Sequence, residues 1–178
     1  MDFLTLATER YSVRKFSDKE IGQESIDRII RVDKILRSAQ VAPTACNFQP
    51  QRILVINSEE SLAKLKNCTK WHFDCKLAMF ICYNKDECWT RRYDNTASGV
   101  IDASIVATHM MLAAYEIGIG STWVMSYDPE AIRNEFQIPD NIEPVALLVM
   151  GYPADDAVPS EMHTKFRPLE DIVSYNAF

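Results

Sequence analysis

The chain has 178 residues, of which 47% are hydrophobic, and a formal net charge of −6 at pH 7. This length is sufficient for one domain with a well-filled core, and the composition is that of a globular protein. An acidic chain lacks the broad basic surface that displaces counterions from nucleic-acid phosphates, so general nucleic-acid binding is disfavoured and any anion site must be local.

The start of the chain and its cysteines indicate a compartment. The first residues, MDFLTLATERYS, carry an acid at position 2 and no basic region ahead of an apolar core, so we expect no secretory signal peptide. The five cysteines form no CxxC pair and are odd in number, which favours a reducing compartment over a disulfide framework. We expect a cytoplasmic protein with no metal site. Its cysteines are expected to be packing residues or bystanders and not metal ligands, namely Cys46, Cys68, Cys75, Cys82 and Cys88.

Helices and strands alternate through the first half of the chain. We expect an amphipathic helix at Phe3–Glu9 and a longer helix at Glu24–Gln40, which ends where VAPT introduces a proline. A strand follows at Arg52–Asn57. Ser58 is positioned to cap a short helix, and the apolar run Lys76–Tyr83 is typical of a buried strand.

The segment Ser98–Gly118 predicts a long helix that is apolar on most sides. Titratable residues recur every seven positions along one thin stripe, at Asp102, His109 and Glu116, and this stripe argues against a membrane span. A domain of this size would not readily wrap such a helix alone. We therefore expect the helix at the centre of the fold or against a second subunit.

The remaining elements are a strand, a helix and a second strand. STWVMS predicts a strand at Ser121–Ser126, and PVALLVMGYP predicts a buried strand at Pro144–Pro153. Between them, Asp128 is placed as the N-cap of a helix that ends at Phe136, with Pro129 at its first position.

Cations gather close to both ends of the chain. In ERYSVRKF, Arg10, Ser12 and Arg14 alternate, so in an extended segment their side chains project to one side. Arginine makes bidentate, permanently charged contacts with phosphate oxygens, and serine adds a short donor, so the pattern favours a phosphate or a polyol. The alternative is a solvated group of surface charges. A second basic pair, Lys165 and Arg167, lies in the C-terminal segment.

The stretch APTACNFQP predicts a rigid polar loop. Two prolines, Pro43 and Pro50, bracket Thr44, Asn47 and Gln49 directly before a strand. Neutral amides in a fixed loop are suited to the polar edge of a heterocycle. An ordinary helix-to-strand connection is the alternative.

Taken together, these segments resemble the nitroreductase family of flavin enzymes. The resemblance is carried by RYSVRKF, APTACNFQP, LAAYEIGIGSTWV, LLVMGYP and KFRPLEDIV, in that order and across nearly the whole chain. It implies a single FMN-binding domain over residues 1–178 with an α+β fold, in which helices flank a central mixed β-sheet and the buried central helix lies at a homodimer interface. Such enzymes take hydride from NADH or NADPH and reduce nitroaromatics, quinones or other small conjugated acceptors by a ping-pong mechanism.

The resemblance also assigns residues to FMN. Arg10, Ser12 and Arg14 match the motif that holds the phosphate, the ribityl chain and the pyrimidine edge, and Lys165 and Arg167 match the basic pair that completes the phosphate site. No side chain need act as proton donor or nucleophile. The expected further role of Arg14 is to tune the reduced flavin, because a fixed cation stabilises negative charge near the N1 and C2 carbonyl edge.

Two further segments match the surroundings of the flavin ring. The loop residues Thr44, Ala45 and Asn47 match a loop contributed by the other subunit, although the position of Ala45 is often serine, so Ala45 is expected to offer only its backbone. The segment that backs the isoalloxazine ring is matched by Trp123, Val124, Met125 and Ser126.

The chain departs from longer family members between Lys70 and Gly99. These members place an asparagine from an insertion against the ring, and no counterpart is evident here. The substrate side is therefore undetermined, with candidates among the aromatic residues Trp71, Phe73, Trp89 and Tyr93. Two alternatives to a nitroreductase-type enzyme stay open: an FMN-binding, storage or redox-responsive protein on the same scaffold, and specialised flavin chemistry such as reductive dehalogenation.

Overall fold

The computed structural model describes residues 2–19, 21 and 25–178. The expected helices and strands are present in these ranges with ends shifted by one or two residues, and the helix after Ser58 extends to Cys68. The start of the second expected helix, Glu24, lies outside the described residues. The elements are α1 (Phe3–Glu9), α2 (Ser25–Gln40), η1 (Ala45–Asn47), β1 (Gln51–Ile56), α3 (Glu59–Cys68), β2 (Leu77–Asn84), α4 (Gly99–Glu116), β3 (Gly120–Val124), α5 (Pro129–Phe136), β4 (Ile142–Gly151), η2 (Glu161–Thr164) and η3 (Leu169–Asp171).

The strands form one sheet in the order β1-β2-β4-β3, and every neighbouring pair is antiparallel. The expectation of a mixed sheet is therefore wrong for these four strands. Parallel pairing occurs in the described residues only at an isolated bridge between Ser12 and Ser121, at the β3 edge. Strand composition does not reveal strand direction, because β2 and β4 are buried on both faces and their continuous apolar runs are also typical of parallel strands.

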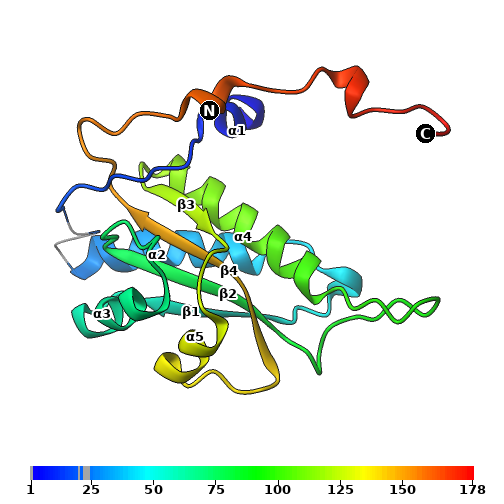
Figure 1. The fold of residues 1–178 in the computed structure, drawn as a ribbon, viewed down its shortest axis with the longest axis horizontal. Coiled ribbons are helices and arrows are strands. Elements are labelled where there is room, and N and C mark those ends of the chain that lie inside the picture. The colour runs from blue at the N-terminus through cyan, green and yellow to red at the C-terminus, as the bar shows by residue number, and fades with distance from the viewer. Residues whose placement is uncertain (1, 20, 22–24) are drawn as a thin grey trace.

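Helices cover both faces of the sheet. On one face, α2 and α4 enclose a core that includes Met79 of β2 and Met110 of α4. On the other face, α3 and α5 pack over Phe80, which follows Met79 in β2, and bury Ile132. The alternation of neighbouring β2 residues between the two cores follows from the two-residue period of a strand. Figure 1 shows the two helix pairs on opposite sides of the sheet.

Helix α4 is buried on one side and open on the other. Ala103, Val106 and Met110 are fully buried against the sheet and α2, whereas Val100 is 53% exposed and Ile101 is 60% exposed. The helix therefore presents an apolar outer face in the single chain. Its place at a subunit interface stays a prediction. In the part of the chain that the structure describes, no helix is long and apolar enough to cross a membrane.

The C-terminal segment follows the N-terminal helix and then leaves the body of the domain (Figure 1). It contains the short helices η2 and η3 and adds no strand to the sheet. Many of its apolar side chains are exposed, namely Val158, Met162, Phe166, Leu169, Ile172, Val173, Tyr175 and Phe178. The segment thus contributes little to the two cores.

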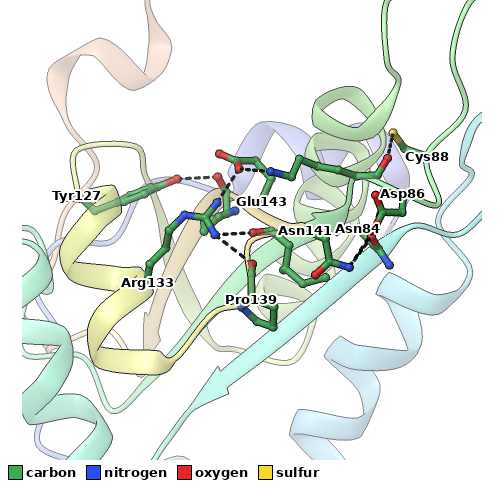
Figure 2. A network of polar contacts seen from close by, with 11 residues as sticks. Asn84, Asp86, Cys88, Tyr127, Arg133, Pro139, Asn141 and Glu143 are labelled. Carbon is green, nitrogen blue, oxygen red and sulfur yellow. Dashed lines mark hydrogen bonds and ion pairs between the residues drawn. The ribbon is translucent and has the colours of Figure 1, made fainter.

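A polar network ties α5 to the ends of β2 and β4 (Figure 2). Arg133 donates to the carbonyl oxygens of Pro139 at 3.2 Å and Ile142 at 2.9 Å, and to the Glu143 carboxylate at 2.6 Å. Lys85 approaches the same carboxylate at 4.0 Å. We refer to these five residues, Arg133, Pro139, Ile142, Glu143 and Lys85, as the Arg133 network. Its charges and carbonyls are satisfied within the chain.

Candidate functional site

The segment that carries Arg10, Ser12 and Arg14 is attached to the edge of the sheet by backbone hydrogen bonds of Val13. Its N–H donates to the Ser121 carbonyl at 3.0 Å, and its own carbonyl accepts from the Thr122 hydroxyl. Val13 is 1% exposed, whereas Ser12 is half-buried and Arg14 is exposed. This arrangement agrees with the expected alternation of an extended segment.

This attachment depends on a glycine in β3. A Cβ atom at Gly120 would lie 2.6 Å from Cγ2 of Val13, which is closer than such atoms approach, so a larger residue there would displace the segment. Further along, the Ser17 N–H donates to the Tyr152 carbonyl at 2.9 Å and the Ala154 N–H donates to the Lys15 carbonyl at 3.0 Å. The basic segment therefore runs along β3 and the residues that follow β4.

The two basic ends of the chain lie beside one another. The Tyr11 hydroxyl donates to the Ala157 carbonyl at 3.4 Å, and the Tyr11 ring meets the His163 ring edge-on with centroids 6.2 Å apart. Because Tyr11 separates Arg10 from Ser12 and His163 is two residues from Lys165, these contacts bring the two segments into proximity (Figure 1).

Four of the five cations in these two segments have no acidic partner among the described residues. Arg10, Arg14, Lys165 and Arg167, which we call the basic clamp, form no ion pair with any residue in the described ranges. Among the described residues, the Arg14 guanidinium donates only to the Ser12 carbonyl, at 3.4 Å. Lys15, in the same stretch, instead pairs with the Asp156 carboxylate. In an acidic chain, four neighbouring cations without internal partners are well suited to an external anion.

The predicted polar loop adopts a constrained backbone. Cys46, Asn47 and Gln49 have φ values of 50°, 56° and 52°, which lie in the left-handed region. The loop is held partly by its own side chains, because the Thr44 hydroxyl oxygen accepts from the Gln49 N–H and the Asn47 amide oxygen accepts from the Gln49 side chain, both at 3.1 Å. Asn47 is exposed.

The backbone N–H of Ala45 is hydrogen-bonded within the chain. It donates to Oδ1 of Asp102 at 2.9 Å. The expected contact between the Ala45 backbone and a ligand stays a prediction. Asp102 is 2% exposed and also accepts the Ser98 hydroxyl at 2.7 Å. Sequence analysis placed Asp102 in a thin polar stripe of α4 and missed this contact. The available signal was a lone carboxylate in the first turn of an otherwise apolar helix.

The predicted ring-backing segment begins in the sheet and ends outside it. Val124 closes β3 and is buried, and Met125, just beyond it, is 62% exposed. The carbonyl of Ser126 accepts the Thr69 hydroxyl at 2.6 Å. Because β3 also carries the Ser12 bridge, this segment and the N-terminal basic segment lie on the same edge of the sheet.

One of the four candidate aromatic residues lies beside this segment. Trp71 and Ser126 both line a cavity of about 350 Å³, and Trp71 is 51% exposed. Tyr93 is 98% exposed in a hairpin closed by the bridge between Thr90 and Ala97. A larger cavity of about 750 Å³ lies next to α3 and the start of β2 and contains none of the predicted site residues.

The polar loop and the basic clamp lie towards opposite ends of α4. Asp102, in the first turn of α4, holds the loop, whereas the segment Ile117–Ile119 after α4 leads directly into the strand that holds Ser12. The helix has 18 residues and is therefore about 27 Å long. Within one chain, most of this length separates the two predicted halves of the site.

Comparison with known proteins identifies the family. The sequence model of the nitroreductase family matches residues 7–79 and 73–152. The chain belongs to the nitroreductase family. A nitroreductase family protein of Clostridium difficile 630 is 41% identical and has a TM-score of 0.90 over 100% of both chains.

Proteins of lower sequence identity to this chain are also assigned as nitroreductases. A protein of Archaeoglobus fulgidus that is assigned as an NADH dehydrogenase/NAD(P)H nitroreductase is 31% identical over 172 residues, which cover 93% of either chain. A nitroreductase of Exiguobacterium sibiricum, solved in complex with FMN, is 24% identical with a TM-score of 0.79 over 99% of this chain and 98% of that chain. This last similarity concerns the fold alone.

The buried thiols of this nitroreductase-family chain are not suited to reaction. Burial raises the pKa of Cys75 and of Cys82 to about 12, and that of Cys68 to about 11. A thiol must ionise to act as a nucleophile or a metal ligand, so these three residues are packing residues. Cys46, in the polar loop, is exposed and forms no disulfide.

Proposed function

We propose that the protein is an FMN-dependent oxidoreductase that takes hydride from NADH or NADPH and transfers electrons to nitroaromatics, quinones or similar small conjugated acceptors. The observation that carries this proposal is the basic clamp. Four cations come from two segments, distant in sequence, that meet at Tyr11 and His163, and they form no ion pair among the described residues, while the adjacent Lys15 is paired. Such a group is suited to a phosphate monoester rather than to a neutral ligand.

The donor groups of the chain fit the parts of FMN. The basic clamp suits the terminal phosphate, the half-buried Ser12 suits a hydroxylated ribityl chain, and the exposed amide of Asn47 suits the polar edge of the ring. The amide oxygen of Asn47 accepts from the Gln49 side chain, so the N–H₂ group of Asn47 is the part suited to an external acceptor. FMN, when bound, supplies the two-electron chemistry, and the protein supplies position and electric field.

The residues have distinct proposed roles. Arg10, Lys165 and Arg167 hold the phosphate, and Arg14 holds the pyrimidine edge, where its charge favours the reduced cofactor. The segment from Trp123 to Ser126 backs the ring. The family relationship supports these assignments. The proposed use of FMN is also supported by the name of a relative, an FMN reductase [NAD(P)H] of Bacillus subtilis that is 22% identical over 166 residues.

We further propose a homodimer in which each flavin contacts two chains. The separation of Ser12 and the polar loop along α4 favours this arrangement, because most of the length of that helix lies between them within one chain. The exposed apolar face of α4 and the apolar C-terminal segment offer the surface that a partner would cover.

Complementation tests the shared site. If Arg10→Ala and Asn47→Ala are each inactive, a tagged heterodimer of the two variants carries one doubly defective site and one intact site. We expect this heterodimer to recover about half of wild-type activity per dimer, as two-fold symmetry requires. Activity equal to the mean of the two mutant homodimers would place both residues in the same site of one chain.

Steady-state kinetics test whether the electron donor and the acceptor use the same face of the flavin. A donor and an acceptor that occupy the same face must bind in turn, so steady-state kinetics should be ping-pong, with parallel double-reciprocal lines. Intersecting lines would indicate a ternary complex and contradict this mechanism.

The cofactor itself provides the decisive experiment. Protein purified without added cofactor should be yellow, and acid or heat should release FMN and not FAD. NADH or NADPH should then bleach the flavin, and a nitroaromatic or quinone should restore its colour. Colourless protein that fails to bind FMN in a fluorescence titration would refute the proposal, whereas bound flavin that never bleaches would favour a storage protein.

A further inference from the structure

Asp102 is a buried carboxylate that the chain surrounds with hydrogen-bond donors and no cation. It is 2% exposed and forms no ion pair with the described residues. Oδ1 accepts the Ala45 N–H at 2.9 Å and Oδ2 accepts the Ser98 hydroxyl at 2.7 Å. A buried carboxylate is unfavourable unless its oxygens are satisfied, so both contacts are required to retain it.

The Ser98 side chain hydrogen-bonds to Asp102 and does not cap helix α4. It occupies the N-cap position of α4 with φ −80° and ψ −12°, and its side chain accepts no N–H from the helix. An N-cap serine normally accepts such an N–H, which stabilises the helix end. Here its hydroxyl donates to Asp102 instead. The positive end of the helix dipole at this position additionally favours the carboxylate.

The Ala45 N–H is the attachment point of the polar loop. For residues 44–49, the other hydrogen bonds in the described part of the chain stay within the loop, between Thr44 and Asn47, Ala45 and Phe48, Thr44 and Gln49, and Asn47 and Gln49. The bond to Asp102 is therefore the one that fixes the loop to another element. It lies directly before Cys46 and Asn47, whose left-handed backbone depends on support from its surroundings.

We propose that Asp102 is a positioning residue for the cofactor: it anchors Ala45 so that Thr44 and Asn47 are presented to FMN in a fixed geometry. This inference rests on the proposed FMN function. The loop requires the acceptor oxygen of residue 102 and not its charge. An asparagine can therefore replace Asp102, because its oxygen can face Ala45 while its N–H₂ donates to the Ser98 hydroxyl, which can accept as well as donate.

The test uses two variants of Asp102 and one control in the same helix. Asp102→Ala should raise the Kd for FMN by about tenfold, because it leaves the half-buried Ala45 N–H without its acceptor. Asp102→Asn should bind FMN nearly as tightly as wild type. Val106→Ala removes a buried side chain one turn further along α4 without touching the loop, and should lower thermal stability with little change in Kd.

Hydrogen exchange of the Ala45 amide provides a readout that does not depend on FMN. Exchange should be slow in wild type and Asp102→Asn, and about tenfold faster in Asp102→Ala, while amides in the second half of α4 keep their protection. Faster exchange throughout α4 would indicate general destabilisation and overturn the proposal.

The outcomes separate this inference from the proposed function. If wild type fails to bind FMN, the proposed function is wrong, and the exchange data alone decide whether Asp102 anchors the loop. If wild type binds FMN and Asp102→Ala binds it equally well, the positioning role is wrong. An Asp102→Asn variant as impaired as Asp102→Ala would show that charge is required, and would also overturn the proposal as stated.

Discussion

The basic clamp and the Arg133 network both concentrate arginine and lysine, but they use these side chains in opposite ways. In the network, Arg133 meets two carbonyls and a carboxylate that also faces Lys85 (Figure 2). In the clamp, four cations face no acid of the described chain. A cation that is satisfied within its own chain supports the fold, whereas a cluster left unsatisfied is available to a ligand. This contrast makes separate predictions for binding and for stability.

The largest expected effect is on cofactor affinity. Arg10→Ala should raise the Kd for FMN by about 100-fold, because a charge-assisted hydrogen bond to phosphate contributes up to about 3 kcal/mol. Lys15→Ala is the matched control in the same stretch. Its exposed ion pair with Asp156 should contribute little, so Kd should change by about twofold or less. Fluorescence titration measures both, and equal effects of the two variants would remove the distinction between clamp and paired cations.

The next effect is on stability. Arg133→Ala should lower the free energy of unfolding by about 2 kcal/mol, because the Ile142 carbonyl and the Glu143 carboxylate lose their donor. Arg91, which pairs with Asp94 in an exposed hairpin, is the control, and Arg91→Ala should leave the free energy of unfolding close to that of wild type, because exposed ion pairs contribute little. Urea unfolding of the FMN-free proteins tests this prediction. A marked loss of FMN affinity in Arg133→Ala would show that the two regions are not independent.

A smaller effect distinguishes Arg14 from the other clamp residues. Arg14→Ala should lower the midpoint potential of bound flavin by about 30 mV, which for a two-electron couple corresponds to about 1.4 kcal/mol. The reason is that the lost cation stabilises reduced flavin more than oxidised flavin. Potentiometry of FMN-saturated protein provides the measurement. An unchanged potential would assign Arg14 to phosphate binding or to structure.

The smallest effect concerns the thiols. Cys82 lies near Arg133 and Glu143, and burial raises its pKa to about 12, so it should stay protonated and unlabelled by a thiol reagent at pH 8. The thiolate becomes more abundant only as the pH rises towards this value. Cys46 is exposed in the polar loop and should react first, and bound FMN should slow this reaction if the loop contacts the cofactor. Mass spectrometry of partially labelled protein identifies the sites, and rapid labelling of native Cys82 would contradict the buried geometry.

Features set by neighbouring residues could be predicted from the sequence. Asp128 and Pro129 begin α5 as expected, and Ser58 caps α3 with a reciprocal bond to Ser61. The alternation around Val13 is likewise local, and it placed Arg10, Ser12 and Arg14 correctly in one extended segment.

Features set by distant contacts could not be predicted in this way. Asp102 meets Ala45 across 57 residues, and neither position alone indicates the other. Strand direction and order also depend on which distant segments pair, so the antiparallel order β1-β2-β4-β3 was not evident from the apolar runs. The residues on the substrate side could not be predicted for the same reason, since Trp71 and Ser126 are 55 positions apart in the sequence and line one cavity only in the folded chain.

The attachment of Val13 to β3 has a consequence for the order in which the protein forms. Val13 and Thr122 are joined across 109 residues, and Tyr11 and Ala157 across 146. The contacts among α4, β3 and β4 are much closer in sequence, and local contacts generally form faster than distant ones. During synthesis, the N-terminal arginines leave the ribosome first but have no strand to join until β3 has emerged. We therefore expect a nascent chain to be unable to retain FMN until nearly its whole length has been made.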